Sequence, residues 1–200
     1  LTAIGNSIRT KEGTTAAVPV AKMAERIGAL EDPEFKKLVM RSIKSYTHPT
    51  LDVVGGYAFC KCTMLTSVYL PKVLAIMTNG FAYCSALTSV HFPELVNLMS
   101  NAFANCTKLE SADLPKCRLI DSMALSYCSA LKTVRAIPTE IGAYAFSGDK
   151  VLEVLDFTGC TAVPTLENVN AFTNVPKTCE IRVPASLLSA WRTATNWSTF

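Results

Sequence analysis

GFAYCSALTSVHFP, residues 80–93, is the stretch that decides the fold, because it recurs along the chain at a fixed spacing. Three other copies align with it: AFCKCTMLTSVYLP at 58–71, AFANCTKLESADLP at 102–115 and ALSYCSALKTVRAIP at 124–138. Cys62, Cys84, Cys106 and Cys128 hold the same place in each copy, 22 residues apart. Self-similarity at such a period predicts a repeat protein in which every copy forms one coil of a solenoid.

Weaker copies extend the repeat in both directions. A half-copy covers residues 43–49, and two degenerate copies cover residues 146–157 and 172–184. In the first degenerate copy Asp149 stands where the others have cysteine, and Leu125 replaces the aromatic ring one copy earlier. We therefore expect about six or seven turns of solenoid over residues 43–184.

Within a copy, apolar and polar residues alternate as in a strand with one buried face. Val68 and Leu70 flank Tyr69, and Pro71 follows, which ends the strand because proline has no amide hydrogen to donate. A second apolar position is expected to close each coil on its far side: Val54, Ile76, Leu98, Ile120 and Ile141. One copy has no core of its own, so stacked neighbours must bury these rows as ladders.

The eight cysteines do not follow the spacing of a metal site. No Cys-x-x-Cys pair occurs, Cys60-Lys-Cys62 is a weak signal, and the chain has two histidines. We expect the four repeating cysteines to be reduced, buried, small apolar residues, because parallel Cβ vectors on stacked strands do not favour a disulfide. The remaining four lie off this ladder and receive no role from the sequence: Cys60, Cys117, Cys160 and Cys179.

Composition and charge exclude several classes of function. Charged residues make up 18% of the chain and the net charge is only +3, which does not indicate nucleic acid or an acidic membrane as partner. No run of eighteen apolar residues occurs, so no membrane span is expected. The sequence also lacks a phosphate-binding loop, a nucleophile elbow and a zinc-protease motif. We expect neither an enzyme nor a bound cofactor or metal.

Two columns of exposed residues can be written down if the strands stack in register. One column reads Thr47, Tyr69, His91, Asp113, Arg135, Asp156 and Arg182, and the neighbouring one reads Ser45, Ser67, Ser89, Ser111 and Thr133. His48, in contrast, holds the position of Leu70 and is expected to be partly buried. The second half of the first column alternates in sign, so each charge is expected to face an opposite charge on the next coil.

Two interpretations of these columns stay open. The charges could form a solubilising ladder beside tolerated serines. Alternatively, a candidate ligand strip could stack on a sugar or dock a peptide side chain. This strip consists of Tyr69 and His91, flanked by Ser67 and Ser89, with Asp113 and Arg135 beside them.

The order F-x-x-C-x-x-L-x-x-V-x-L-P resembles the BspA-like, treponemal-type leucine-rich repeat over residues 43–184. The resemblance implies an α+β solenoid of short parallel strands. It also implies a bacterial, secreted or surface-exposed protein that binds other molecules without turning them over. Departures from the pattern are Leu125, Asp149 and the 26-residue interval from Phe146 to Phe172.

The flanks of the repeat indicate helical caps, which solenoids need to shield their end coils. Residues 1–42 are expected to form a helical N-terminal module, and residues 1–30 resemble one that precedes such repeats in phage-tail and prophage proteins. Residues 185–200 resemble the family's C-terminal ending, and the spacing of Leu187, Leu188, Trp191 and Ala194 predicts an amphipathic capping helix.

The function expected from this resemblance is that of a monomeric adhesin-like scaffold, extracellular or on a cell surface, binding a protein or glycan of a host or bacterium. The alternative is a structural or receptor-binding component of a phage or prophage tail, located in a virion. Fold alone does not choose between them.

Overall fold

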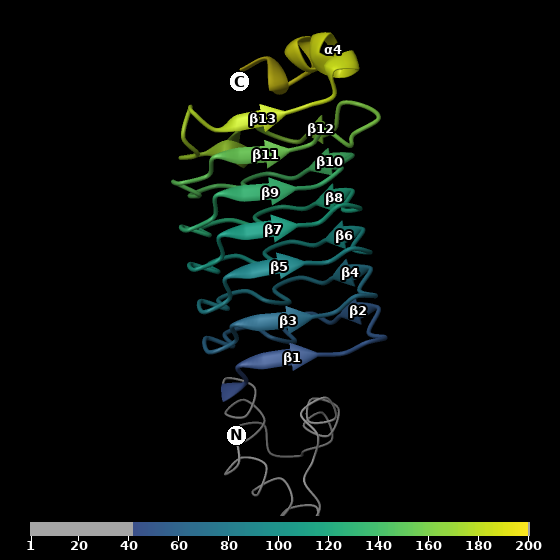
Figure 1. Ribbon diagram of the computed structural model, residues 1–200. Helices are drawn as coiled ribbons and strands as arrows, with labels where there is room; N and C mark the ends of the chain where they lie inside the picture. Colours follow the sequence, from purple (N-terminus) through teal and green to yellow (C-terminus); the bar gives the residue numbers. More distant parts are fainter. Residues whose placement is uncertain (1–41, 200) are drawn as a thin grey trace, which may run out of the picture.

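The computed structural model describes residues 42–199, which form one stack of coils running from β1 to a C-terminal cap (Figure 1). The predicted N-terminal module lies outside these residues except for Ser42. Seven three-residue strands follow one another along the first side: β1 Ser45–Thr47, β3 Ser67–Tyr69, β5 Ser89–His91, β7 Ser111–Asp113, β9 Thr133–Arg135, β11 Val154–Asp156 and β13 Glu180–Arg182. All pairings between strands on this side are parallel.

Two-residue strands form a continuous parallel sheet along the other side of the stack. They are β2 Val53–Val54, β4 Ala75–Ile76, β6 Asn97–Leu98, β8 Leu119–Ile120, β10 Glu140–Ile141 and β12 Thr165–Leu166. The second residue of each is buried, as predicted for the position that closes the coil. Turns connect the two sheets within the described coils, so the solenoid itself is a β-solenoid and the expected α+β class is corrected.

The predicted cysteine ladder is confirmed, and hydrogen bonds between coils define it. Each thiol donates to the carbonyl oxygen of the phenylalanine 25 residues earlier: Cys84 to Phe59 at 3.1 Å, Cys106 to Phe81 at 3.2 Å and Cys128 to Phe103 at 3.2 Å. All eight cysteines of the chain are thiols. Burial raises the pKa of Cys106 to about 12, so this thiol keeps the proton that it donates.

The phenylalanines of the repeat stack face to face beside this ladder. Phe59 and Phe81 lie 4.9 Å apart between ring centroids, and Phe81 and Phe103 lie 5.1 Å apart, with interplanar angles of 4° and 1°. Leu125 interrupts the stack, which resumes with Phe146 and Phe172 at 5.5 Å. These side chains are almost fully buried, and each ring buries a large apolar area between successive coils.

Two of the cysteines without an assigned role belong to a second buried ladder. The amides of Val73, Leu95, Cys117 and Cys160 each donate to the carbonyl oxygen three residues earlier, so these residues hold the same place in successive coils. Cys117 and Cys160 are both buried there. The repeat period counted from the strand prolines would have identified this position, since Cys117 follows Pro115 as Val73 follows Pro71.

The turn between Ile141 and Phe146 packs directly on the backbone of the previous coil. A Cβ atom added to Gly142 would lie 2.5 Å from the amide nitrogen of Ser122 and 2.8 Å from the carbonyl carbon of Asp121. Backbone atoms cannot move aside as a flexible side chain can, so glycine is required here.

Replacing Gly142 with alanine is expected to lower the free energy of unfolding by about 1–3 kcal/mol, because the two coils must separate locally. Urea unfolding followed by circular dichroism measures this change. Gly55→Ala is the matched control, since a Cβ at Gly55 meets no atom within 4 Å. Equal stabilities of the two variants would contradict the argument.

The first sheet is interrupted between β3 and β5. β1 and β3 form a two-stranded sheet, whereas β5 to β13 form a five-stranded one, and Figure 1 shows wider spacing between β3 and β5. Val68 on β3 is only half-buried, while its counterparts Val90 and Val134 are buried. The interruption affects one side of the stack only, because β2, β4 and β6 pair without a break.

The C-terminal cap is smaller than the predicted helix. A 3-10 turn at Ala185–Leu187 leads into α4, Leu188–Thr193, and a second 3-10 turn spans Trp197–Thr199. Of the residues of α4 only Trp191 is buried, and Leu188 is 42% exposed. The helix ends early because the following residues, Ala-Thr-Asn, are extended or left-handed and the side chains of Thr and Asn favour such conformations.

Candidate functional site

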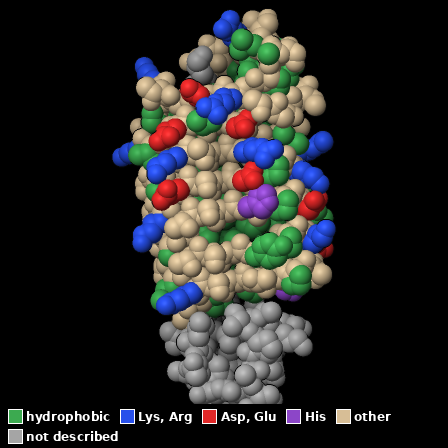
Figure 2. Space-filling model, viewed as in Figure 1, with side chains coloured by type: hydrophobic (Ala, Val, Ile, Leu, Met, Phe, Trp, Pro, Cys, Tyr) green, Lys and Arg blue, Asp and Glu red, His purple; other side chains and the backbone are tan. Residues whose placement is uncertain are grey.

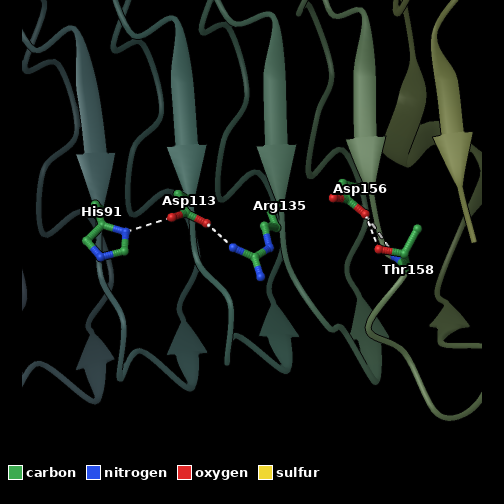
Figure 3. A network of polar contacts seen from close by, with 5 residues as sticks. All are labelled: His91, Asp113, Arg135, Asp156 and Thr158. Atoms are coloured by element: carbon green, nitrogen blue, oxygen red, sulfur yellow. Dashed lines mark hydrogen bonds and ion pairs between the residues drawn. The ribbon is translucent and has the colours of Figure 1, made fainter.

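The exposed column on the first side of the stack forms a row of linked polar side chains. His91 on β5 and Asp113 on β7 make a contact of 2.7 Å between Nδ1 and Oδ2, and Arg135 on β9 lies 3.5 Å from the other oxygen of Asp113 (Figure 3). The parallel register places these residues opposite one another on successive strands. Their side chains are 38–62% exposed, so they remain available to a partner.

The predicted alternation of charges is present in the register, which places Asp156 between Arg135 and Arg182, but no ion pair joins these three side chains directly in the described residues. Asp156 accepts hydrogen bonds from the hydroxyl and the amide of Thr158, at 2.6 and 3.0 Å, and so turns toward its own chain (Figure 3). Arg182 pairs with Glu180 of its own strand at 2.9 Å. The pKa of Asp156 is lowered, chiefly by the hydroxyl of Thr158.

A shallow hollow of about 320 Å³ lies over β7, β9, β11 and β13. Asp113, Arg135, Asp156 and Arg182 surround it, and its remaining wall consists of Ser111, Ala112, Thr133, Val134 and Val154. Figure 2 shows this face, on which charged groups of both signs border a strip of small, uncharged side chains. The hollow therefore offers both hydrogen-bond donors and acceptors to a ligand.

The structure brings together only part of the candidate ligand strip. His91, Asp113 and Arg135 lie in one linked row, and Asp113 and Arg135 also line the hollow. Tyr69 is 59% exposed but lies on β3, beyond the interruption of the sheet. Ser67 and Ser89 begin β3 and β5 and lie on either side of the same interruption.

Sequence reasoning put two further residues of the hollow, Asp156 and Arg182, in the exposed column but not in the strip. Both belong to degenerate copies, in which the repeat pattern is weakest. The signal that could have selected them is the run of four charges from Asp113 onward, which was interpreted as a ladder of pairs. His48 is half-buried, as predicted, and its Nδ1 is buried without a hydrogen-bond partner in the described coils.

The polar groups of this face are carboxylates, guanidinium groups, one imidazole and hydroxyls. His91 and Asp113 are in contact, but the hollow contains no cysteine and its hydroxyl groups belong to Ser111 and Thr133 on the sheet. Among residues 42–199 no three His, Cys, Asp or Glu side chains gather as a metal site would require. Within the same residues, no helix is long and apolar enough to cross a membrane.

These features define a class of protein: a β-solenoid of leucine-rich coils that presents a polar strand face. The family model of the BspA type leucine rich repeat region matches residues 30–153 in six copies, and the chain belongs to this family. No curated protein matches the chain.

Two solved structures resemble the fold. A leucine-rich repeat protein of T. pallidum superposes with a TM-score of 0.59 at 24% sequence identity, over 76% of this chain and 70% of that one. A leucine-rich cell surface protein of Faecalibacterium prausnitzii A2-165 matches at 17% identity with a TM-score of 0.38, over 78% of this chain and 63% of that one. At this level of identity the likeness to the T. pallidum structure establishes the solenoid fold.

Proposed function

We propose that the chain is a non-enzymatic scaffold that binds a protein partner through the strand face of β5 to β13. The hollow over β7, β9, β11 and β13 carries this proposal, because it is exposed and bordered by two acidic and two basic side chains. A stacked solenoid presents such side chains at regular intervals over an extended surface, which suits contact with a polypeptide.

The balance of charges favours a polar peptide segment over a strongly charged polymer. Arg135 and Arg182 can donate to carbonyl or carboxylate oxygens, whereas Asp113 and Asp156 can accept from amides or basic side chains. Oδ1 of Asp113 is buried and makes no hydrogen bond in the described residues beyond its loose ion pair with Arg135.

We place this scaffold outside the cell or on its surface. The membership of the BspA-type repeat family supports that location. A component of a phage or prophage tail is the alternative that residues 1–30 suggested, and nothing in residues 42–199 favours it. The candidate ligand strip around Tyr69 and His91 would extend the proposed surface toward β3.

The proposal is tested by capturing surface proteins of epithelial and bacterial cells on the immobilised chain, with a glycan array in parallel. The variant Asp113→Asn with Arg135→Gln is expected to lower capture of bound proteins about tenfold, because polar groups at the centre of an interface lose their partners. Tyr69→Ala with His91→Ala tests the strip separately.

Glu94→Gln with Lys116→Gln is the matched control, since it removes an ion pair of 2.8 Å between neighbouring coils outside the hollow. Capture by this variant is expected to equal that of the unmodified chain. Equal capture by the hollow variant would reject the site. Binding confined to the glycan array would replace the protein partner with a sugar.

A further inference from the structure

The C-terminal end of the stack contains a cavity beneath its cap. Its volume is about 760 Å³, and it lies between the last coil, with β13, and the cap formed by α4 and the following turn. Ile181 and Val183 are half-buried there, whereas the equivalent Leu155 and Phe157 one coil earlier are completely buried. The short cap therefore leaves space over the last coil.

The walls of this cavity are mainly apolar and aromatic. Phe172, Trp191 and Trp197 contribute rings, and the two indoles meet edge to face at 4.4 Å between centroids. Nε1 of Trp197 donates to the carbonyl oxygen of Pro164 at 2.8 Å. Nε1 of Trp191 is buried and has no acceptor among the described residues, so the wall contains one unused donor.

The charged residues of the cavity are both basic. Lys177 and Arg192 line it and are exposed, and no aspartate or glutamate belongs to its lining. Neither cation takes part in an ion pair within residues 42–199, unlike Lys116, Lys132, Arg135 and Arg182. An apolar space of this size with two unpaired cations is complementary to an organic anion.

We propose that this cavity is a binding site for an amphipathic organic anion, such as an aromatic or aliphatic carboxylate. The apolar body of the ligand lies between the terminal coil and the two tryptophans, and its anionic group lies near Lys177 and Arg192. The residues that line the cavity differ from those that line the hollow on the strand face of β5 to β13, so the cavity offers a second ligand class to the same scaffold.

The chain provides its own reporter for this site. Trp191 and Trp197 are its only two tryptophans, and both line the cavity. Titration with 1-anilinonaphthalene-8-sulfonate is expected to quench their emission by energy transfer, and decanoate is expected to displace the probe. The neutral analogue N-phenyl-1-naphthylamine is expected to bind about tenfold more weakly, because each exposed cation contributes a factor of a few.

Two variants and one control separate the contribution of charge to binding from the contribution of cavity shape. Lys177→Gln with Arg192→Gln is expected to weaken the sulfonate about tenfold and leave the neutral analogue unchanged. Lys108→Gln with Arg118→Gln removes the same charge elsewhere on the stack. This control is expected to leave the affinities for the sulfonate and for the neutral analogue unchanged. Val183→Phe places a ring inside the cavity and is expected to weaken binding of both probes about tenfold. The fold tolerates phenylalanine there because Phe157 is the equivalent residue one coil earlier.

Equal affinity for the anionic and neutral probes would overturn the assignment, and so would full binding by Val183→Phe. A dimer joined at this end, detected by sedimentation and dissolved by Val183→Phe, would make a second copy of the chain the occupant and would likewise overturn it.

Discussion

Replacing Asp149 with cysteine is expected to raise the free energy of unfolding at pH 7 by about 2–4 kcal/mol and to remove a dependence of stability on pH. Asp149 is completely buried at the position that Cys128 and Cys106 hold in earlier coils. Burial raises its pKa to about 9. Oδ1 accepts a hydrogen bond from the amide of Cys128 at 2.8 Å, but Oδ2 has no partner in the described residues.

The direction of the pH effect follows from the two pKa values. An unfolded aspartate titrates near 3.8 and the folded one near 9, so between these values the folded state binds more protons than the unfolded state. Stability contributed by the protonated form is complete below about pH 4 and decreases as pH rises to about 9. At about 1.4 kcal/mol per unit, the loss between pH 4 and 7 is at most about 4 kcal/mol.

Cysteine suits this position because its neighbours show how the coil accommodates it. The amides of Cys84 and Cys106 donate to the carbonyl oxygen three residues earlier, and their thiols donate to the previous coil. Without the carboxylate of Asp149, the amide of Cys128 can return to that arrangement. Asp149→Asn is the isosteric control, since it keeps an acceptor for this amide but cannot titrate.

Urea unfolding at pH values from 5 to 9 measures these differences. Both variants are expected to have stabilities that vary little between pH 5 and 8. Closer to pH 9 the buried thiols, whose pKa values are raised, lower the stability of all variants alike. If Asp149→Asn retains the full pH dependence of the unmodified chain, the buried carboxyl is not its source.

Phe81→Ala is expected to lower the free energy of unfolding by about 3–5 kcal/mol. The ring is completely buried and stacks between Phe59 and Phe103, so its removal takes contacts from both neighbouring coils. The carbonyl oxygen of Phe81 accepts a hydrogen bond from the thiol of Cys106. The space left by the missing ring would therefore lie directly beside the cysteine ladder. Because coils contact only their neighbours, the loss should also weaken cooperativity between the two ends.

Phe81→Leu is the matched control, because Leu125 holds the same row and is completely buried. We expect this variant to lose about 1–2 kcal/mol, since leucine fills most of the space. Thermal and urea unfolding monitored by circular dichroism give both values. A loss below 1 kcal/mol for Phe81→Ala would mean that the ring stack contributes little to holding the coils together.

The sequence determined the coil, its period and its buried rows. Alternation around Tyr69 identified the strands, and the spacing of Cys84 and its equivalents identified the ladder, because each depends on residues close in sequence whose pattern is repeated. Repetition makes such predictions strong: a position buried in one coil is buried in the next. The degenerate copies at 146–157 and 172–184 were also correctly aligned, as the pairing of β11 with β13 confirms.

Only the tertiary structure decided how the exposed side chains pair. Asp113 links to both neighbours in the column, whereas Asp156, with the same position and charge, bonds to Thr158 of its own coil. These alternatives differ by little free energy at a solvated surface, so the repeat pattern does not select between them. The interruption between β3 and β5 likewise follows from packing within the stack and has no signature in a period that is regular there.

The C-terminal end of the stack shows the same division between what the sequence determines and what the tertiary structure decides. Sequence periodicity fixed which residues face inward in every inner coil, because each has a neighbour on both sides to bury it. At β13 one neighbour is missing, and the degree of burial depends on how far the cap reaches over Ile181 and Val183. That distance is set by where α4 ends and by the packing of Trp191 on Trp197, which are contacts between segments that no local pattern encodes.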